Sequence, residues 1–237
     1  MERRDISRLF HLTAGRGIAL AREEIAIRNL DSQEIKGCFF VGNPLYINQM
    51  ANADRNKIEG GLLGKINDPE AAIRFGTSNV DEFSYWAWRS CGVVNLQMVL
   101  ASINPNFNKS TMDLVREGLD AGGYDVAKDV GWYHKGLIKL ANQYGVRGET
   151  KKFIPSSQLA VEIFNGRYVM ASVKSRLKDG HILLLFGIKT DERGNLAGFF
   201  AHDSNGLDSE GISKFISKSD FDKISTRRAI LLSIPHE

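Results

Sequence analysis

Two spacings of apolar residues divide the chain into a helical part and a strand-rich part that follows it. From Cys91 to about Ser102 the residues are apolar on nearly every side, which is typical of a helix buried all round. The apolar spacing and end signals predict three more helices, in segments 110–123, 132–145 and 155–166. We expect the helix that begins at Cys91 to be the central one.

Short β-rich runs dominate the rest of the chain. They read RYVMASVKS, HILLLFGIKT, LAGFFAHD and RRAILLSI, and the letters DERGN between the second and third are typical of a turn. Because helices come first and strands follow, the pattern predicts an α+β fold, with the central helix packed on the sheet.

The part of the chain before Cys91 is less regular. A helical stretch near 18–29 and the apolar run GCFFVG predict an N-terminal extension, residues 1–43, packed on a main domain of residues 44–237. Residues 50–83 are polar and weakly periodic, which favours an inserted loop with one helical turn after Pro69.

Composition narrows the class of protein. The net charge is only +3, with 31 basic and 28 acidic residues, so no basic footprint for nucleic acid stands out. No apolar run is long enough for a signal peptide or a membrane span. The two cysteines, Cys38 and Cys91, are too few for a disulfide framework or a structural zinc site. We therefore expect a cytoplasmic protein that binds neither nucleic acid nor membrane and needs no cofactor or metal.

Cys91 is the main candidate for chemistry. The first turn of a helix carries unpaired N–H groups and a partial positive charge, which stabilise a thiolate. Ser90 is a plausible N-cap, and Gly92 would leave the approach to the sulfur open. The alternative is that Cys91 is a small apolar residue that fills the core. The same packing role is expected for Cys38, as a buried and inert residue.

A nucleophilic cysteine needs a base and a group that orients the base. His181 begins the strand HILLLFGIKT, and Asp203 ends the next strand, LAGFFAHD. In a hairpin the start of one strand lies beside the end of the other, so these two residues are expected to be neighbours. The alternatives are a surface histidine and a turn-initiating aspartate. By alternation His202 points the other way, and His134 is expected to line the cleft or cap a helix locally.

Three segments carry a family resemblance: YWAWRSCGVVNLQMVL, GWYHKGLIKLANQYGV and the stretch from GRYVMASVKS to AHDSNG. In order and spacing they resemble papain-like cysteine peptidases of the bacteriocin-processing, double-glycine leader branch. The resemblance covers roughly residues 44–206. It implies a papain-like fold and a triad of Cys91, His181 and Asp203.

The resemblance also implies the donors that would hold the oxyanion. In the family a glutamine before the cysteine has this role, together with the backbone N–H of the cysteine. The segment NPLYINQ resembles the family segment that contains this glutamine, so the resemblance implies the oxyanion-donor role for Gln49. Tyr85 and Ser84 are the nearest substitutes. Trp86, Trp88 and Trp132 are expected in the core or the cleft wall.

These observations predict a thiol hydrolase, a cysteine peptidase that cleaves peptide or protein substrates through a thioester acyl-enzyme. One alternative is an acyltransferase or amidase, in which the same triad admits an acceptor other than water. The other is a catalytically inactive peptidase-like module that binds peptides. The specificity, the oligomeric state and the role of residues 1–43 and 50–83 stay open at this level.

Overall fold

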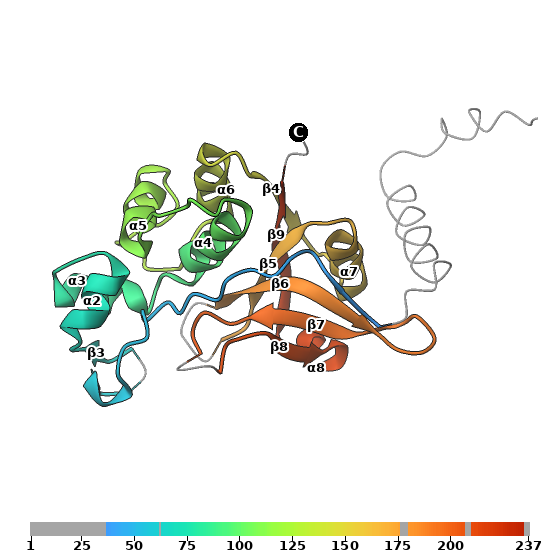
Figure 1. Ribbon diagram of the computed structural model, residues 1–237, viewed down its shortest axis with the longest axis horizontal. Coiled ribbons are helices and arrows are strands. Elements are labelled where there is room, and N and C mark those ends of the chain that lie inside the picture. Colours follow the sequence, from blue (N-terminus) through green and yellow to red (C-terminus); the bar gives the residue numbers. More distant parts are fainter. Residues whose placement is uncertain (1–36, 62, 176–179, 207–209, 235–237) are drawn as a thin grey trace, which may run out of the picture.

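The computed structural model describes residues 37–61, 63–175, 180–206 and 210–234 (Figure 1). The helix expected near residues 18–29 lies outside these residues. The predicted α+β class and the central helix on an antiparallel sheet are both confirmed. Within the described ranges the helices are α2 (Pro69–Phe75), α3 (Val80–Ala87), α4 (Cys91–Ile103), α5 (Thr111–Asp120), α6 (His134–Gln143), α7 (Ser156–Phe164) and α8 (Lys218–Ile224).

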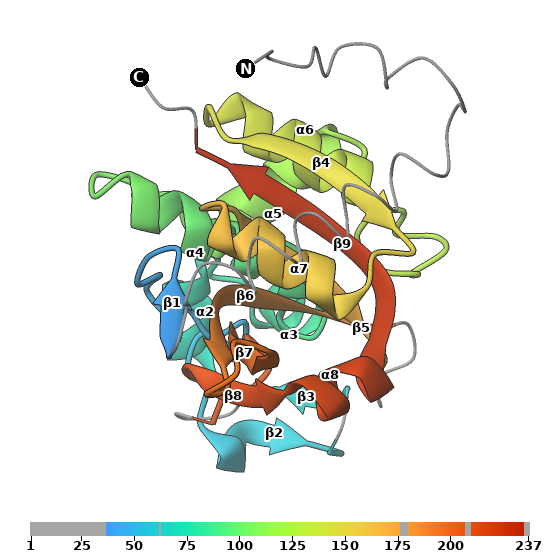
Figure 2. The same cartoon turned by 90° about the vertical axis from the view of Figure 1, so that its right-hand side faces the viewer.

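Antiparallel strands form one large sheet, which has seven strands in the described part of the chain. They are ordered β4 (Arg147–Lys152), β9 (Ser225–Ser233), β5 (Tyr168–Val173), β6 (His181–Thr190), β7 (Leu196–His202) and β8 (Lys214–Ser217), with β1 (Cys38–Phe40) also paired to β6. Figure 2 shows β4 running beside the long strand β9. The helices α2 to α6 lie together on one side of the molecule in Figure 1.

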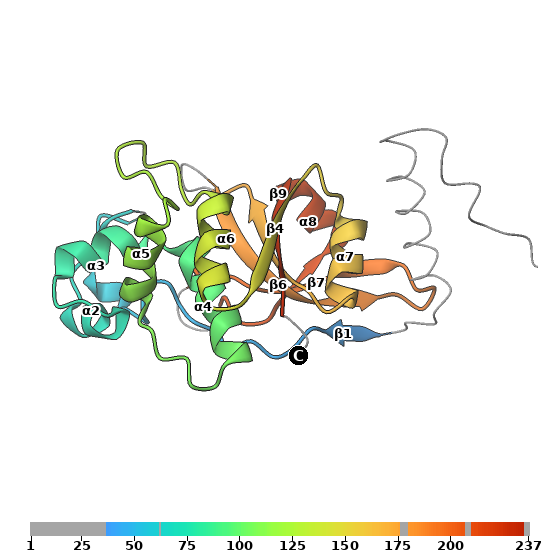
Figure 3. The same cartoon turned by 90° about the horizontal axis from the view of Figure 1, so that it is seen from above.

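The central strands are apolar because both faces of the sheet are covered. Along β5, Met170 faces a core formed with α4 and α6, while Val169 and Ala171 face a second core formed with α7 and α8. In Figure 3, α4 and α6 lie beside the sheet, with α5 farther out. Continuous apolar runs, in place of strict alternation, are what a sheet buried on both faces requires.

The segment 50–83 is not a loop with a single helical turn, and this expectation was wrong. It contains a 3-10 helix (Arg55–Lys57), a ribbon of β2 (Ile58–Glu59) and β3 (Lys65–Ile66), α2 and the start of α3. Asp68 caps α2 and Pro69 occupies its first turn. Phe75 and Phe83 are fully buried and pack edge to face, with ring centroids 5.3 Å apart, so the segment contributes to the core.

Three further elements were not predicted from the sequence. The strand β4 reads RGETKK and pairs with β9, while β8 and α8 continue from β7 toward β9. β1 lies within the expected N-terminal extension and adds a strand to the main sheet. The division of the chain near residue 43 stays a prediction.

Cys38 is exposed, so the expectation that it is buried was wrong. The strand β1 alternates, so Cys38 and Phe40 face outward while Phe39 turns inward against Phe164, with ring centroids 5.1 Å apart. No helix in the described ranges is both long enough and apolar enough to span a bilayer.

Candidate active site

Cys91 is the first residue of α4, as the apolar pattern predicted, and it is only partly buried. Ser90 occupies the N-cap position, but its side chain makes no capping hydrogen bond and its Oγ is buried without a partner among the described residues. Gly92 is buried in the first turn of α4. It packs against Trp132 and Leu137, where an added Cβ would lie 2.9 Å from Leu137 Cδ1. The glycine therefore lets these side chains approach the start of the helix.

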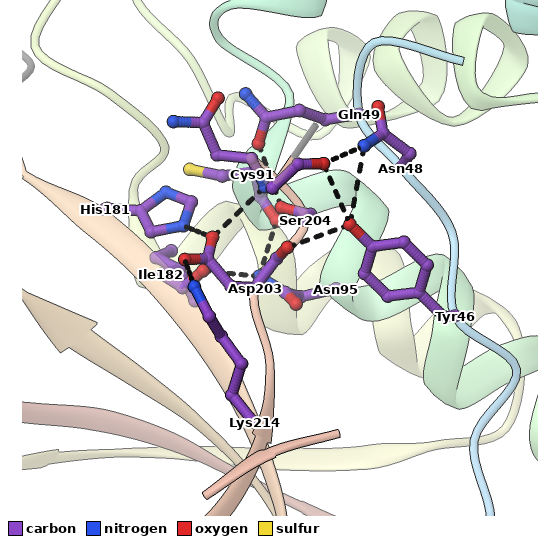
Figure 4. A network of polar contacts seen from close by, with 12 residues as sticks. Tyr46, Asn48, Gln49, Cys91, Asn95, His181, Ile182, Asp203, Ser204 and Lys214 are labelled. Atoms are coloured by element: carbon purple, nitrogen blue, oxygen red, sulfur yellow. Dashed lines mark hydrogen bonds and ion pairs between the residues drawn. The ribbon is translucent and has the colours of Figure 1, made fainter. Parts of the chain in front are cut away.

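The structure brings His181 and Asp203 together. His181 begins β6 and Asp203 directly follows β7, and His181 Nε2 lies 2.7 Å from Asp203 Oδ1 (Figure 4). The same carboxylate accepts the backbone N–H of Asn205 at 3.1 Å and lies 3.6 Å from Lys214 Nζ. Figure 4 shows the sulfur of Cys91 beside the His181 ring nitrogen that faces away from Asp203. The imidazole thus lies between a thiol and a carboxylate.

The electrostatics of this group favour a charged imidazole. Burial by itself would lower the pKa of His181, but hydrogen bonds to Asp203 and Cys91 outweigh burial and raise the pKa to about 10. Burial would raise the pKa of Asp203, and the hydrogen bond and positive charge of His181 lower it instead. His181 and Asp203 therefore each stabilise the charged form of the other.

Asn95 is a residue of the site that the sequence analysis missed. Its Nδ2 donates to the carbonyl oxygen of Cys91 at 2.9 Å and to that of Ile182 at 2.6 Å. One amide therefore joins the first turn of α4 to the residue after His181 in β6. Asn95 is fully buried, and the available signal was a polar residue four positions after the cysteine on a largely apolar helix.

Gln49 is completely buried close to the start of α4. Its Nε2 donates to the carbonyl oxygen of Ala87 at 2.9 Å, and its Oε1 accepts the hydroxyl of Ser204 at 2.9 Å. A primary amide has two N–H groups, so one donor of Gln49 remains for another acceptor. The segment between Gln49 and Cys91 is folded, so the two residues lie close together although they are far apart in the sequence. Ser84 has a different role, since its Oγ accepts the N–H of Ile66 at 2.8 Å.

The other histidines near the site have separate environments. His202 is buried, its Nδ1 accepts the N–H of Ser213 at 3.0 Å, and its Nε2 lies 2.9 Å from the Pro44 oxygen. It therefore connects β7 to neighbouring loops. The Nε2 of His134 lies 2.9 Å from Ser172 Oγ. Burial and the positive charge of Arg228 lower the pKa of His134 to about 4, so it is neutral at neutral pH.

A cavity of about 800 Å³ opens beside the candidate triad. Cys91 and His181 line it, together with residues of α6 and the ends of β4, β5 and β9. Trp132 is largely buried and forms part of its wall, as expected for that residue, while Trp88 donates to the carbonyl of Gly64. In the described part of the chain, no three His, Cys, Asp or Glu side chains cluster closely enough to hold a metal ion.

Comparison with known proteins gives structural similarities only. No protein-family model and no curated protein matches the chain. The chain is similar to the peptidase domain of Streptococcus ComA, a bifunctional ABC transporter of a quorum-sensing pathway. The identity is 18%, the coverage is 62% of this chain and 93% of that chain, and the TM-score is 0.45.

Two other solved structures are similar to a comparable extent. One is a double-glycine motif protease from an AMS/PCAT transporter in complex with its leader peptide, at 17% identity, covering 61% of this chain and 84% of that chain, with a TM-score of 0.44. The other is described as a C39-like peptidase from Bacillus anthracis, at 14% identity, covering 63% of this chain and 90% of that chain, with a TM-score of 0.46. The functional proposal rests on the geometry of the site.

Proposed function

We propose that this protein is a cysteine peptidase in which Cys91, His181 and Asp203 cleave a peptide bond. The observation that carries the proposal is the His181 imidazole held between the Cys91 thiol and the Asp203 carboxylate at the edge of an open cavity. A nucleophile, a base and a group that orients the base are the parts that acyl transfer through cysteine requires.

The reaction follows from these positions. The Cys91 thiolate forms a C–S bond to the substrate carbonyl carbon, and the His181 imidazolium gives its proton to the leaving nitrogen as the C–N bond breaks. The products are an amine and a thioester. Neutral His181 then takes a proton from water, whose oxygen attacks the thioester and releases the thiolate and a carboxylic acid. Asp203 keeps the ring oriented and stabilises its positive charge.

The oxyanion of each tetrahedral intermediate needs donors on one side of the sulfur. We assign this role to the backbone N–H of Cys91 and to the second N–H of Gln49. The support is the fixed position of the Gln49 amide, which the carbonyl of Ala87 and the hydroxyl of Ser204 hold from two directions. An amide held in this way needs no reorganisation when the charge develops.

A peptide or protein is the substrate class that fits the cavity. The similar double-glycine protease is in complex with a leader peptide, which is in keeping with a peptide substrate for this chain. Cys38 and Cys91 are both free thiols, which favours a reducing compartment such as the cytoplasm.

The test is a digest of a mixture of synthetic peptides, analysed by mass spectrometry, with the full chain and with Cys91→Ala and His181→Ala. We expect cleavage by the unchanged chain and none by either variant. Cys38→Ala is the matched control, because it removes the exposed thiol and should leave cleavage unchanged. If the mixture is cleaved equally by Cys91→Ala, or not cleaved by any form, the proposal fails.

A second arm distinguishes hydrolysis from acyl transfer. Both reactions pass through the same thioester and differ only in the group that attacks it. With an added small amine, a hydrolase gives carboxylic acids as its main products, whereas an acyltransferase gives amides. Dominant amide products would replace the peptidase assignment by acyl transfer on the same three residues.

A further inference from the structure

The cavity beside Cys91 carries charge of one sign. Four Lys and Arg side chains line it in addition to His181, and no Asp or Glu is among its described lining residues. Lys135 and Lys139 come from α6, Lys152 from the end of β4 and Arg228 from β9. The chain as a whole has a net charge of only +3, so this concentration of positive charge is local.

In the described part of the chain, these four cations lack the carboxylate partners that several other basic side chains have. None of them forms an ion pair with a described residue. By contrast, Arg89 lies 2.8 Å from Asp129, and Lys109 lies 2.9 Å from Glu117. Unpaired cations from three separate elements that converge on one cavity are available to an anionic ligand.

The remaining wall of the cavity suits a peptide more than a small ion. Val130 and Tyr133 are 48% and 40% exposed, and together with Trp132 they give the cavity an apolar and aromatic side. His134 is neutral at neutral pH, so it adds no charge. A ligand that satisfies both sides would carry an apolar side chain close to acidic ones.

We propose that the cavity selects peptide segments with Asp or Glu beside the scissile bond. This inference rests on the proposed peptidase function and names its substrate class. The carboxylates would lie against α6, β4 and β9 while the scissile carbonyl reaches Cys91. Since the four cations are exposed, the attraction is screened by salt, and the preference weakens as ionic strength rises.

The experiment compares two fluorescein-labelled peptides that differ only in having several Glu residues or the same number of Gln residues. Their binding to the full chain carrying Cys91→Ala is measured by anisotropy, so that the readout does not depend on catalysis. We expect the Glu peptide to bind at least about fivefold more tightly. Lys139→Glu with Lys152→Glu should abolish or reverse this preference.

The matched control is Lys189→Glu, which makes the same charge change outside the cavity. Lys189 lies near the far end of β6, with its ammonium 5.6 Å from the centroid of the Phe215 ring. This variant should leave the preference unchanged. Equal binding of the two peptides, or an equal loss of preference in Lys189→Glu, would overturn the inference.

The cleavage profile separates this inference from the peptidase function. Cleavage by the unchanged chain at sites without nearby Asp or Glu would reject the acidic substrate class and keep the peptidase. A preference for the Glu peptide in binding, with no cleavage that depends on Cys91, would keep the acidic subsite and reject the peptidase.

Discussion

Replacing Asn95 with leucine tests whether one amide aligns the candidate nucleophile with its base. The substitution keeps a similar side-chain size and removes the donor that joins the carbonyls of Cys91 and Ile182. Two buried hydrogen bonds at about 1 kcal/mol each, with two acceptors left without this donor, should lower the free energy of unfolding by about 2–4 kcal/mol.

The effect on the site should be separate from the effect on stability. Without the amide, the first turn of α4 and the start of β6 can shift relative to each other, which displaces the Cys91 sulfur from His181. A displacement of about 1 Å can cost about a hundredfold in rate. We therefore expect kcat to fall by at least about tenfold, and alkylation of Cys91 by iodoacetamide to slow by a similar factor.

Gln97→Leu is the matched control on the same helix. Gln97 is also buried, donates to the carbonyl of Lys109 at 3.0 Å and accepts the hydroxyl of Thr111 at 2.8 Å, so it joins α4 to the start of α5. Both variants should lose stability in urea unfolding, and only Asn95→Leu should lose Cys91 reactivity. Equal losses of reactivity in the two variants, or no loss in Asn95→Leu, would refute the alignment role.

Three other perturbations test separate parts of the site. Gln49→Ala should lower kcat by about a hundredfold with little change in KM, because an oxyanion donor acts mainly in the transition state. Both constants are measured on any peptide that the chain cleaves. An unchanged kcat would show that Gln49 is not an oxyanion donor and would leave the backbone N–H of Cys91 in that role. Asp203→Asn should slow alkylation of Cys91 more than alkylation of Cys38 in the same sample, because it removes the negative charge that holds the pKa of His181 high. Equal slowing at the two cysteines would show that Asp203 does not affect the reactivity of Cys91. His134 has a pKa lowered to about 4 from 6.5, so the stability it contributes is present above pH 6.5 and is lost as the pH falls toward 4. His134→Asn should flatten this part of the stability curve in urea titrations at a series of pH values, and an unchanged slope between pH 6.5 and 4 would contradict the assignment.

Local sequence was sufficient to place the residues expected to carry the chemistry. The all-round apolar run put Cys91 at the start of a buried helix, and the hairpin between β6 and β7 predicted that His181 and Asp203 would be neighbours. These are short-range consequences of helix periodicity and strand pairing. The length and polarity of residues 50–83 misled the same reasoning, because the core that α2 and α3 join is formed by distant parts of the chain.

The partner of Asn95 in the sheet, the support for Gln49 and the charge of the cavity could not be predicted from the sequence. Each depends on groups far apart in the chain: Asn95 with Ile182, Gln49 with Ser204, and Lys139 with Arg228. No periodicity relates such positions.

The sequence by itself determined the class of fold, the start of the central helix and the pairing of His181 with Asp203. It could do so because side-chain repeats along a helix or a hairpin depend on neighbours that are close in the chain. Only the tertiary structure decided which amide aligns Cys91 with the sheet, how Gln49 is held, and that cations from α6, β4 and β9 share one cavity. These contacts arise when the sheet brings remote segments together, so their physical cause is the packing of the whole domain.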